Sequence, residues 1–265
     1  NLETQLENYI EENLETCFQE FKAFESQGFI IETPNKVKSI VNVRQDDVLL
    51  YVEYEVNVEK DKSKYTIEEF IETSPVQLRK IYEMAEEITQ RQLNYNFLER
   101  WTVEQIAGFG LGLNKDKLPP IAASELDPGE APVYWIKTKV EEDITNNMLP
   151  QYTPFLTVFE SENYKSNLYD TFYERTTIPL ANPNDNYYGD LEVDFNYFNW
   201  WPIYFDLTGR GSSGERIGPE TTSSSYLSFI GIKRYNFYYD VSYPVLVDIY
   251  SEDAFNNEGF HFYFG

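Results

Sequence analysis

The feature of this sequence that most constrains its fold is a change of pattern in the middle of the chain. Residues 1–150 carry 29 acidic and 15 basic residues and place apolar residues at helical spacing. Residues 151–265 are poor in charge and hold about two thirds of the Tyr, Phe and Trp residues. We therefore predict an α+β fold: N-terminal helices with a small antiparallel sheet in residues 1–150, then an aromatic-rich, sandwich-like antiparallel β domain in 151–265.

Periodicity locates the elements of the first half. Apolar residues recur at three- and four-residue steps over residues 2–26 and predict one amphipathic helix, with Cys17 as a small buried residue on its apolar side. Strict alternation over Val48–Val58 predicts a half-buried strand, with shorter strands on either side of it. Ser74-Pro75-Val76-Gln77 has the cap, proline and Gln of a helix start, so a helix is expected to run to about Arg100, and another over Pro132–Asn147.

The second half reads as strands joined by turns. The predicted strands are Phe155–Glu160, Leu168–Arg175, Leu191–Phe198, Trp201–Leu207, Tyr226–Val241, Val245–Tyr250 and Gly259–Phe264. The Ser/Thr/Gly-rich stretch Thr208–Ser225 is expected to be a mobile, exposed loop.

Composition excludes several classes of function. The chain has one His and one Cys, which argues against Ser-His, Cys-His and zinc chemistry. Its formal net charge is −24, which repels nucleic-acid phosphate and anionic lipid, so neither is expected as a partner. Carboxylate chemistry, binding of a hard cation and recognition by aromatic surfaces remain.

Several structural motifs occur in a characteristic order. A helix with a lone Cys precedes a β-hairpin, then come Pro119-Pro120-Ile121, a Trp-started helix at Trp135–Asn147, and the stretch Tyr238–Val247. This order resembles a group of uncharacterised archaeal surface proteins that one membrane helix anchors just upstream of the first helix. The resemblance implies an extracellular location at the cell surface and no known enzymatic activity. It also implies that membrane contact is made only through an anchor upstream of Asn1.

The densest cluster of oxygen ligands lies between Asn182 and Asp194. Calcium prefers six to eight such oxygens, and its candidate ligands here are Asn184, Asp185, Asp190, Glu192 and Asp194. The spacing does not match an EF-hand, and Asn, Asp, Pro and Gly also form turns for their own reasons. A plain turn is therefore favoured over a calcium loop, and no other cofactor is expected.

Neighbouring aromatic residues form the strongest candidate for recognition. Trp200 and Trp201 are adjacent, and adjacent side chains on a strand point to opposite faces, so at most one of them can lie in a single core and the other can be exposed. With Tyr204, Tyr187 and Tyr188 they are the candidate ligand-binding residues, because Trp and Tyr bind sugar rings and protein partners well. Packing of both Trp residues between two layers is the favoured alternative.

Paired carboxylates suggest a further hypothesis. Glycoside hydrolysis needs only two Asp or Glu residues, and Asp206 and Asp240, each among aromatic residues, are the pair to test. Gly108–Leu113 lacks the Lys-Ser/Thr of a phosphate-binding loop, and the lone His261 is expected to be structural.

The first functional hypothesis is therefore a non-enzymatic extracellular surface protein for attachment, filament or envelope assembly, or partner recognition, with a protein or a second copy as partner. The alternative is a carbohydrate-binding module or a carboxylate-dependent glycoside hydrolase, with a glycan as partner.

Overall fold

The computed structural model describes residues 2–17, 21–127, 131–164, 175–180, 187–223, 231–251 and 259–264. The chain divides into two compact units, one mainly of Asn1–Glu83 and one mainly of Met84–Tyr250 with Gly259–Gly265. The division therefore falls near residue 83, whereas the change of composition predicted it near residue 150. The reason is that residues 84–150 supply strands that pair with strands of the aromatic half.

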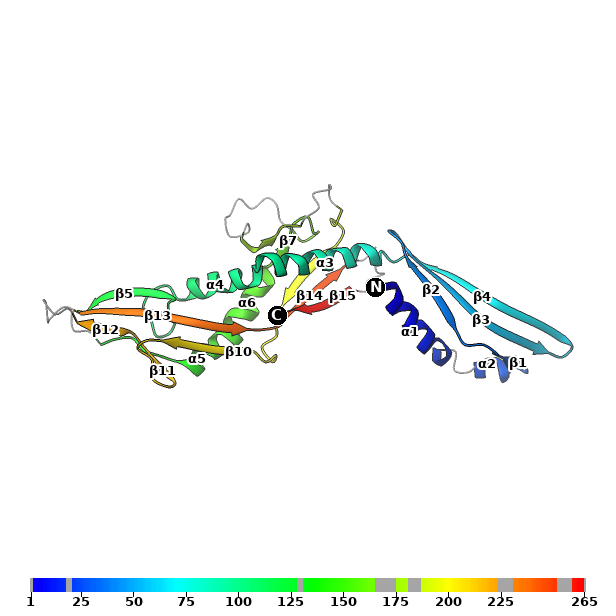
Figure 1. The fold of residues 1–265 in the computed structure, drawn as a ribbon, viewed down its shortest axis with the longest axis horizontal. Coiled ribbons are helices and arrows are strands. Elements are labelled where there is room, and N and C mark those ends of the chain that lie inside the picture. Colours follow the sequence, from blue (N-terminus) through cyan, green and yellow to red (C-terminus); the bar gives the residue numbers. More distant parts are fainter. Residues whose placement is uncertain are drawn as a thin grey trace. The chain divides into compact units, whose positions relative to one another are not determined.

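The first unit is a twisted antiparallel sheet with a helix beside it (Figure 1). Its elements are α1 (Leu2–Cys17), α2 (Lys22–Glu25), β1 (Ile30–Glu32), β2 (Lys38–Val43), β3 (Val48–Lys60) and β4 (Ser63–Ser74). β3 is central, because β4 pairs along one edge of it while β2 and β1 pair in succession along the other. The strands predicted around Val48–Val58 are thus confirmed.

The core of this unit follows from the alternation in β3. Val52, Tyr54 and Val56 point to one face and are buried, and Ile10 and Leu14 of α1 pack against them. The apolar stripe of the helix is therefore satisfied by the apolar face of the sheet.

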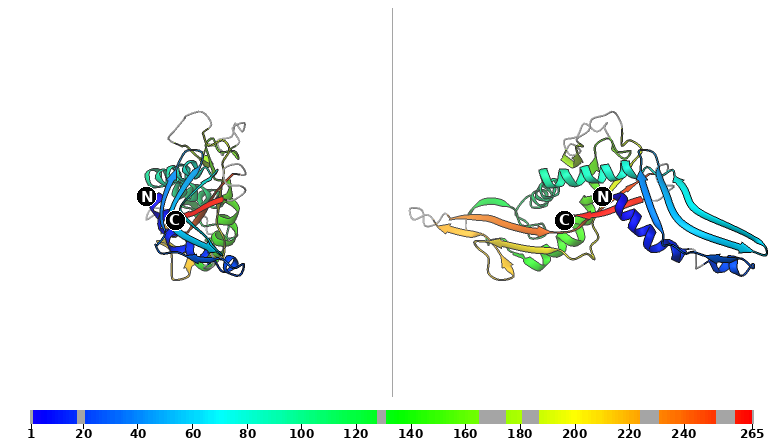
Figure 2. Two further views of the ribbon diagram at one scale, coloured as in Figure 1. Left: turned by 90° about the vertical axis from the view of Figure 1, so that its right-hand side faces the viewer. Right: turned by 45° about the vertical axis from the view of Figure 1, so that its right-hand side comes forward.

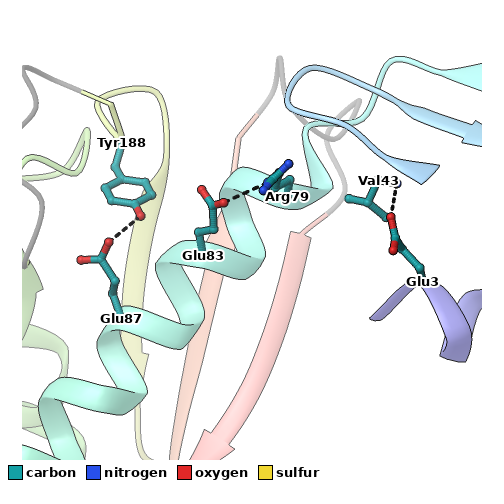
Figure 3. A network of polar contacts seen from close by, with 6 residues as sticks. All are labelled: Glu3, Val43, Arg79, Glu83, Glu87 and Tyr188. Atoms are coloured by element: carbon teal, nitrogen blue, oxygen red, sulfur yellow. Dashed lines mark hydrogen bonds and ion pairs between the residues drawn. The ribbon is translucent and has the colours of Figure 1, made fainter. Parts of the chain in front are cut away.

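Three glutamates of α1 bind the outer edge of β2. The carboxylates of Glu11, Glu7 and Glu3 accept hydrogen bonds from the backbone N–H groups of Ser39 (2.9 Å), Val41 (3.1 Å) and Val43 (3.0 Å). Four helical residues rise by about 6.0 Å and two strand residues by about 6.7 Å, so an i, i+4, i+8 series can follow every second N–H. We call this series the glutamate ladder; Figure 3 shows its contact between Glu3 and Val43, and Figure 2 shows α1 running alongside β2.

The N-terminal helix is shorter than predicted. α1 ends at Cys17, Phe21 has a left-handed backbone with φ of 58°, and only the short α2 follows. Cys17 is exposed, so the expectation that it is a buried hydrophobe was wrong. It is the last residue of α1, three positions after Leu14, which is the last residue of this helix that packs against the core of the sheet.

The second unit contains helices and several small sheets. Its helices are the larger part of α3 (Leu78–Tyr95), α4 (Phe97–Phe109), α5 (Lys137–Asp143), the π-helix η2 (Ile144–Met148), α6 (Leu149–Tyr152) and the 3₁₀ turn η3 (Thr153–Phe155). Its strands are β5 (Ala122–Asp127), β6 (Trp135–Ile136), β7 (Thr157–Val158), β8 (Thr177–Ile178), β9 (Glu192–Asn196), β10 (Tyr204–Gly209), β11 (Arg216–Ile217), β12 (Glu220–Ser223), β13 (Gly231–Ser242), β14 (Val245–Tyr250) and β15 (Gly259–Phe264).

The longest strand of this unit, β13, organises its largest sheet. β12 and β5 pair with the first part of β13, and β10 pairs with Phe237–Ser242. On its inner face Tyr235 and Phe237 contact the ring of Trp135 edge-on at 5.9 and 5.6 Å. The indole N–H of Trp135 donates to the backbone oxygen of Lys117 at 2.8 Å, so this buried ring has its polar atom satisfied.

Several local predictions for this unit were wrong. Asn96, with φ of 49°, divides the helix expected to continue to Arg100, and Trp135–Ile136 form a strand before the helix predicted from Pro132. The predicted loop Thr208–Ser225 contains β11 and β12, because Ile217 pairs with Trp135 and is buried. The α+β class with antiparallel sheets is confirmed, whereas the two-layer sandwich stays a prediction.

Candidate functional site

The candidate site is one face of the three-stranded sheet β15-β14-β9. Val193, Phe195, Val247 and Ile249 point to the other face and are fully buried. Because side chains alternate along a strand, the residues between them, such as Asp194 and Asp248, lie on the outer face. Figure 1 shows the three strands side by side.

Strand register places charged residues abreast on this outer face. Asp248 of β14 lies directly opposite Asp194 of β9 on one side and opposite His261 of β15 on the other. Side chains opposite one another in antiparallel strands have their Cβ atoms about 4.5–5.5 Å apart. We call these three residues the acidic row; Asp194 and His261 are exposed and Asp248 is half-buried.

Hydrogen bonds fix the carboxylates at one end of the face. The Tyr250 hydroxyl donates to the Glu192 carboxylate and lies 3.3 Å from Oδ2 of Asp194. The Asn163 amide donates to Oδ1 of Asp194 at 3.3 Å and to the backbone oxygen of Val193 at 2.9 Å. The carboxylates of Glu192 and Asp194 therefore have defined positions.

The surroundings of these groups shift their proton affinities. Packing around Asp194 raises the pKa of its carboxyl, and the nearby charges of Glu192 and Asp248 add to that rise, against the hydrogen bonds from Tyr250 and Asn163. The bond to Glu192 is the largest of the causes that raise the pKa of the Tyr250 hydroxyl. The face thus concentrates negative charge that a positively charged group would offset.

Aromatic rings border the acidic row. Phe198 and Trp200 stack with ring centroids 5.7 Å apart and an interplanar angle of 22°, and Trp201 meets Phe198 edge-on at 4.9 Å. Trp201 also contacts Tyr263 of β15 at 5.6 Å, and the Tyr263 ring lies 6.4 Å from that of His261. We call Phe198, Trp200, Trp201 and Tyr263 the aromatic platform, which adjoins the acidic row through Tyr263.

A turn, rather than a strand, presents the two Trp residues. The backbone N–H of Trp201 donates to the backbone oxygen of Phe198 at 2.9 Å, which closes a turn after β9, and β10 begins only at Tyr204. The premise that the two side chains point to opposite faces of a strand was therefore wrong. Trp200 is 73% exposed, so packing of both rings between layers is also wrong, while Trp201 is half-buried beside Tyr197.

The predicted Tyr residues do not join the platform. Tyr188 is only 2% exposed and its hydroxyl donates to Oε1 of Glu87 at 3.0 Å (Figure 3), so its ring is unavailable to a ligand. Tyr187 is half-buried against Tyr188, with ring centroids 4.8 Å apart. Tyr204 is exposed at the start of β10, opposite Ser242, and makes no ring contact with the platform within the described ranges.

The predicted calcium ligands receive no support from the structure. Asn184 and Asp185 lie outside the described residues. Of the rest, Glu192 and Asp194 accept the hydrogen bonds given above and Asp190 is half-buried. No group of three or more His, Cys, Asp or Glu side chains that could hold a metal ion is present in the described part of the chain.

The carboxylate pair selected for a hydrolase is brought together on another sheet. Asp206 of β10 lies directly opposite Asp240 of β13, and the ammonium of Lys137 lies 3.5 Å from Oδ1 of Asp206. Neither residue contributes to the face of the β15-β14-β9 sheet.

Sequence reasoning missed Asp248, His261, Phe198 and Tyr263. Alternation along Val245–Tyr250 and Gly259–Phe264 is a signal that Asp248, His261 and Tyr263 point away from the core. Their alignment with Asp194 depends on which strands pair, and no pattern within one strand carries that information.

No protein family, curated protein or solved structure matches this chain. None of the helices in the described ranges is long and apolar enough to cross a membrane.

Proposed function

We propose that this chain is a non-enzymatic recognition protein of the cell surface that binds a protein partner through the aromatic platform and the acidic row. The observation that carries the proposal is the exposure of Trp200, which leaves 73% of its surface in water while it stacks on Phe198. Exposed aromatic rings that other rings hold in place are typical of residues that dominate the energy of an interface.

The platform can supply substantial binding energy. A Trp side chain buries roughly 150–250 Å² when it is covered. At about 25 cal/mol per Å², covering the exposed part of Trp200 gives about 3–4 kcal/mol before the costs of association. One such residue is therefore enough to make a difference that a binding assay detects.

The charges indicate the kind of partner. Asp194 and Asp248 lie beside the platform, and the chain as a whole has a formal net charge of −24. A basic protein surface would offset the row and speed association, while nucleic acid and anionic lipid would be repelled. An Arg side chain could also stack on the exposed indole.

The location outside the cell belongs to the same proposal. It is supported by the resemblance of the motif order to anchored archaeal surface proteins, in which membrane contact is made through an upstream helix. Attachment or assembly of the cell envelope is the setting in which such a face would act. The proposal requires no cofactor, and calcium at the Asn184–Asp194 loop forms no part of it.

Binding to cell envelopes tests the proposal. The purified chain is labelled and titrated with envelope fragments of its source cells, and Trp200→Ala is compared with Tyr95→Ala, a control that removes another exposed ring, from α3. We expect about 30-fold weaker binding for Trp200→Ala, equivalent to about 2 kcal/mol, and no change for Tyr95→Ala. Equal binding by the native chain and Trp200→Ala contradicts the proposal.

A second candidate function rests on Asp206 and Asp240. Their register on β10 and β13 places their Cβ atoms about 4.5–5.5 Å apart, and retaining glycosidases hold two carboxyl groups about 5–5.5 Å apart. Tyr204 and Tyr238 are exposed nearby and offer faces for sugar rings. Release of reducing sugar from a panel of polysaccharides, lost in Asp240→Asn, would support a glycoside hydrolase; the first proposal predicts no release by either chain.

A further inference from the structure

A second surface of the same unit carries an inference that does not depend on the aromatic platform. It lies along β13, where the strand continues past the end of its partner β5. β5 pairs with β13 only as far as Asn236, and Phe237 makes one further bond by donating its N–H to the backbone oxygen of Ile121 at 3.2 Å. Beyond that point this edge of β13 has no neighbouring strand in the described part of the chain.

The free edge presents hydrogen-bonding groups at a known spacing. Backbone groups of alternate residues point to the same edge of a strand, so the N–H and C=O of Tyr239 and Val241 follow those of Phe237. β10 occupies the opposite edge over Phe237–Ser242. Because the Phe237 N–H donates to Ile121 on the β5 edge, alternation directs the N–H groups of Tyr239 and Val241 to that same edge, away from β10.

Two prolines explain why the edge is left open. Pro119 and Pro120 stand just where β5 would have to extend along β13, and proline has no N–H to donate to a ladder. The chain instead uses one side-chain bond there, from the Tyr239 hydroxyl to the backbone oxygen of Pro119. The two prolines therefore prevent β5 from extending along this edge of β13.

Helix α4 turns this open edge into a groove of about 390 Å³. Its walls are Leu98, Glu99, Val103 and Ile106 of α4 and the Tyr239–Tyr243 segment. At the floor the hydroxyls of Thr102 and Tyr243 are 2.7 Å apart, and burial raises the pKa of Tyr243 to about 12. Val103 is 54% exposed, so the helix offers an apolar rim that the described part of the chain leaves uncovered.

We propose that this groove binds an extended peptide segment, which adds to β13 as an antiparallel strand in continuation of β5. Main-chain bonds to Tyr239 and Val241 would supply affinity, as in other cases of strand addition. Successive side chains of the added strand must point to opposite faces of the sheet. Those opposite Tyr239 and Val241 face α4 and are apolar, and those between them lie on the side of Asp240.

Charge makes the expected peptide basic. Asp240 and Glu99 both line the groove, and no Lys or Arg is among the residues that line it. The occupant is therefore a segment with alternating apolar and basic side chains. The first unit shows the contrast, since there the N–H groups along the outer edge of β2 are bonded by the glutamate ladder.

A designed peptide tests the inference on the full chain. The probe is a labelled, capped seven-residue peptide of alternating Lys and Val, followed by fluorescence anisotropy. In the proposed pairing the Val N–H groups face β13 and the Lys N–H groups face away. N-methylation of the Val residues should therefore weaken binding at least tenfold, and N-methylation of the Lys residues should leave it unchanged. A peptide of alternating Glu and Val should bind at least tenfold more weakly.

Variants and amide exchange locate the peptide. Val103→Arg, at the rim, should weaken binding at least tenfold, whereas Ala107→Arg adds the same charge to an exposed position of α4 outside the groove and should change it little. Circular dichroism checks that both variants fold. Amide hydrogen exchange at Tyr239 and Val241 should slow when the peptide is bound.

Three results would overturn the inference. These are no binding at millimolar peptide, binding without protection of Tyr239 and Val241, and equal losses from the two arginine variants. The last result would show attraction to the acidic chain as a whole rather than strand addition.

Discussion

The glutamate ladder makes a prediction that can be worked out from the structure. The variant is Glu7→Ala, which removes the acceptor for the N–H of Val41, a residue that is only 3% exposed. Hydrogen bonds to charged acceptors contribute about 1.5–3 kcal/mol, and a buried N–H left without a partner costs about 1–3 kcal/mol. Because Glu7 itself is half-buried, we expect a loss of about 2 kcal/mol in the local stability of this edge.

Amide hydrogen exchange measures that loss at the group concerned. A decrease of about 2 kcal/mol in the free energy of opening corresponds to about 30-fold faster exchange of the Val41 amide. The method reports on one strand edge and does not require the two units to unfold together.

Two control variants separate the ladder from other effects. Glu12→Ala removes the same charge from the same helix, but Glu12 is exposed and accepts no hydrogen bond in the described part of the chain. It therefore accounts for helix propensity and for the reduced net charge. Glu7→Gln keeps a neutral acceptor and should lose about half as much as Glu7→Ala. If Val41 exchanges at the same rate in Glu7→Ala and Glu12→Ala, the ladder contributes nothing and the reasoning is refuted.

Three further predictions concern the second unit. Trp135→Ala should lower the free energy of unfolding by about 3–5 kcal/mol because Trp135 is only 3% exposed, whereas Trp200→Ala should lower it by less than about 1 kcal/mol. Urea titration followed by circular dichroism compares the two variants. Equal losses of stability would contradict the burial argument. The raised pKa of Asp194 means that the folded chain binds more protons than the unfolded chain just above the usual carboxyl pKa, so stability falls as pH rises through that window. Asp194→Asn should then be more stable than the native chain at pH 7 and no more stable near about pH 3. Urea titrations at both pH values measure the two free energies of unfolding. The same difference between the two chains at both pH values would contradict a raised pKa of Asp194. In Gly211→Ala the new Cβ would lie 2.0 Å from the backbone oxygen of Pro219, so the free energy of unfolding should fall by at least about 1–3 kcal/mol. Thermal unfolding measures this loss, and an unchanged midpoint temperature would contradict the predicted clash.

Elements with strong periodicity could be predicted from the sequence. The alternation over Val48–Val58 and Val245–Tyr250 identified β3 and β14, because one face of each strand is more deeply buried than the other. β5 was missed because Ala122–Asp127 has no apolar alternation. It becomes a strand through pairing with β13, which is a tertiary effect.

Helix breaks and polar edge contacts were harder to predict. Asn96 interrupts the long helix with a left-handed backbone, which nothing in the apolar periodicity of that region indicates. The glutamate ladder had a visible signal in the i, i+4, i+8 spacing of Glu3, Glu7 and Glu11. That spacing is equally typical of a solvated helix face, so only the neighbouring strand distinguishes the two.

The candidate site, too, could be predicted from the sequence only in part. The prominence of Trp200 and Trp201 was visible in the sequence, but their placement on a strand was wrong because a turn closes at Phe198. The acidic row could not be predicted, since Asp194, Asp248 and His261 are neighbours only through strand register.

Covalent-label footprinting of the chain, free and bound to envelope fragments of its source cells, tests the central claim most directly. Labelling of each aromatic side chain is read by mass spectrometry. The proposed recognition face predicts that Trp200, Phe198 and Tyr263 lose labelling in the bound state, while the exposed rings of Tyr9 and Tyr95 keep theirs. Binding that leaves the labelling of Trp200 unchanged would contradict the claim that the aromatic platform is the recognition surface.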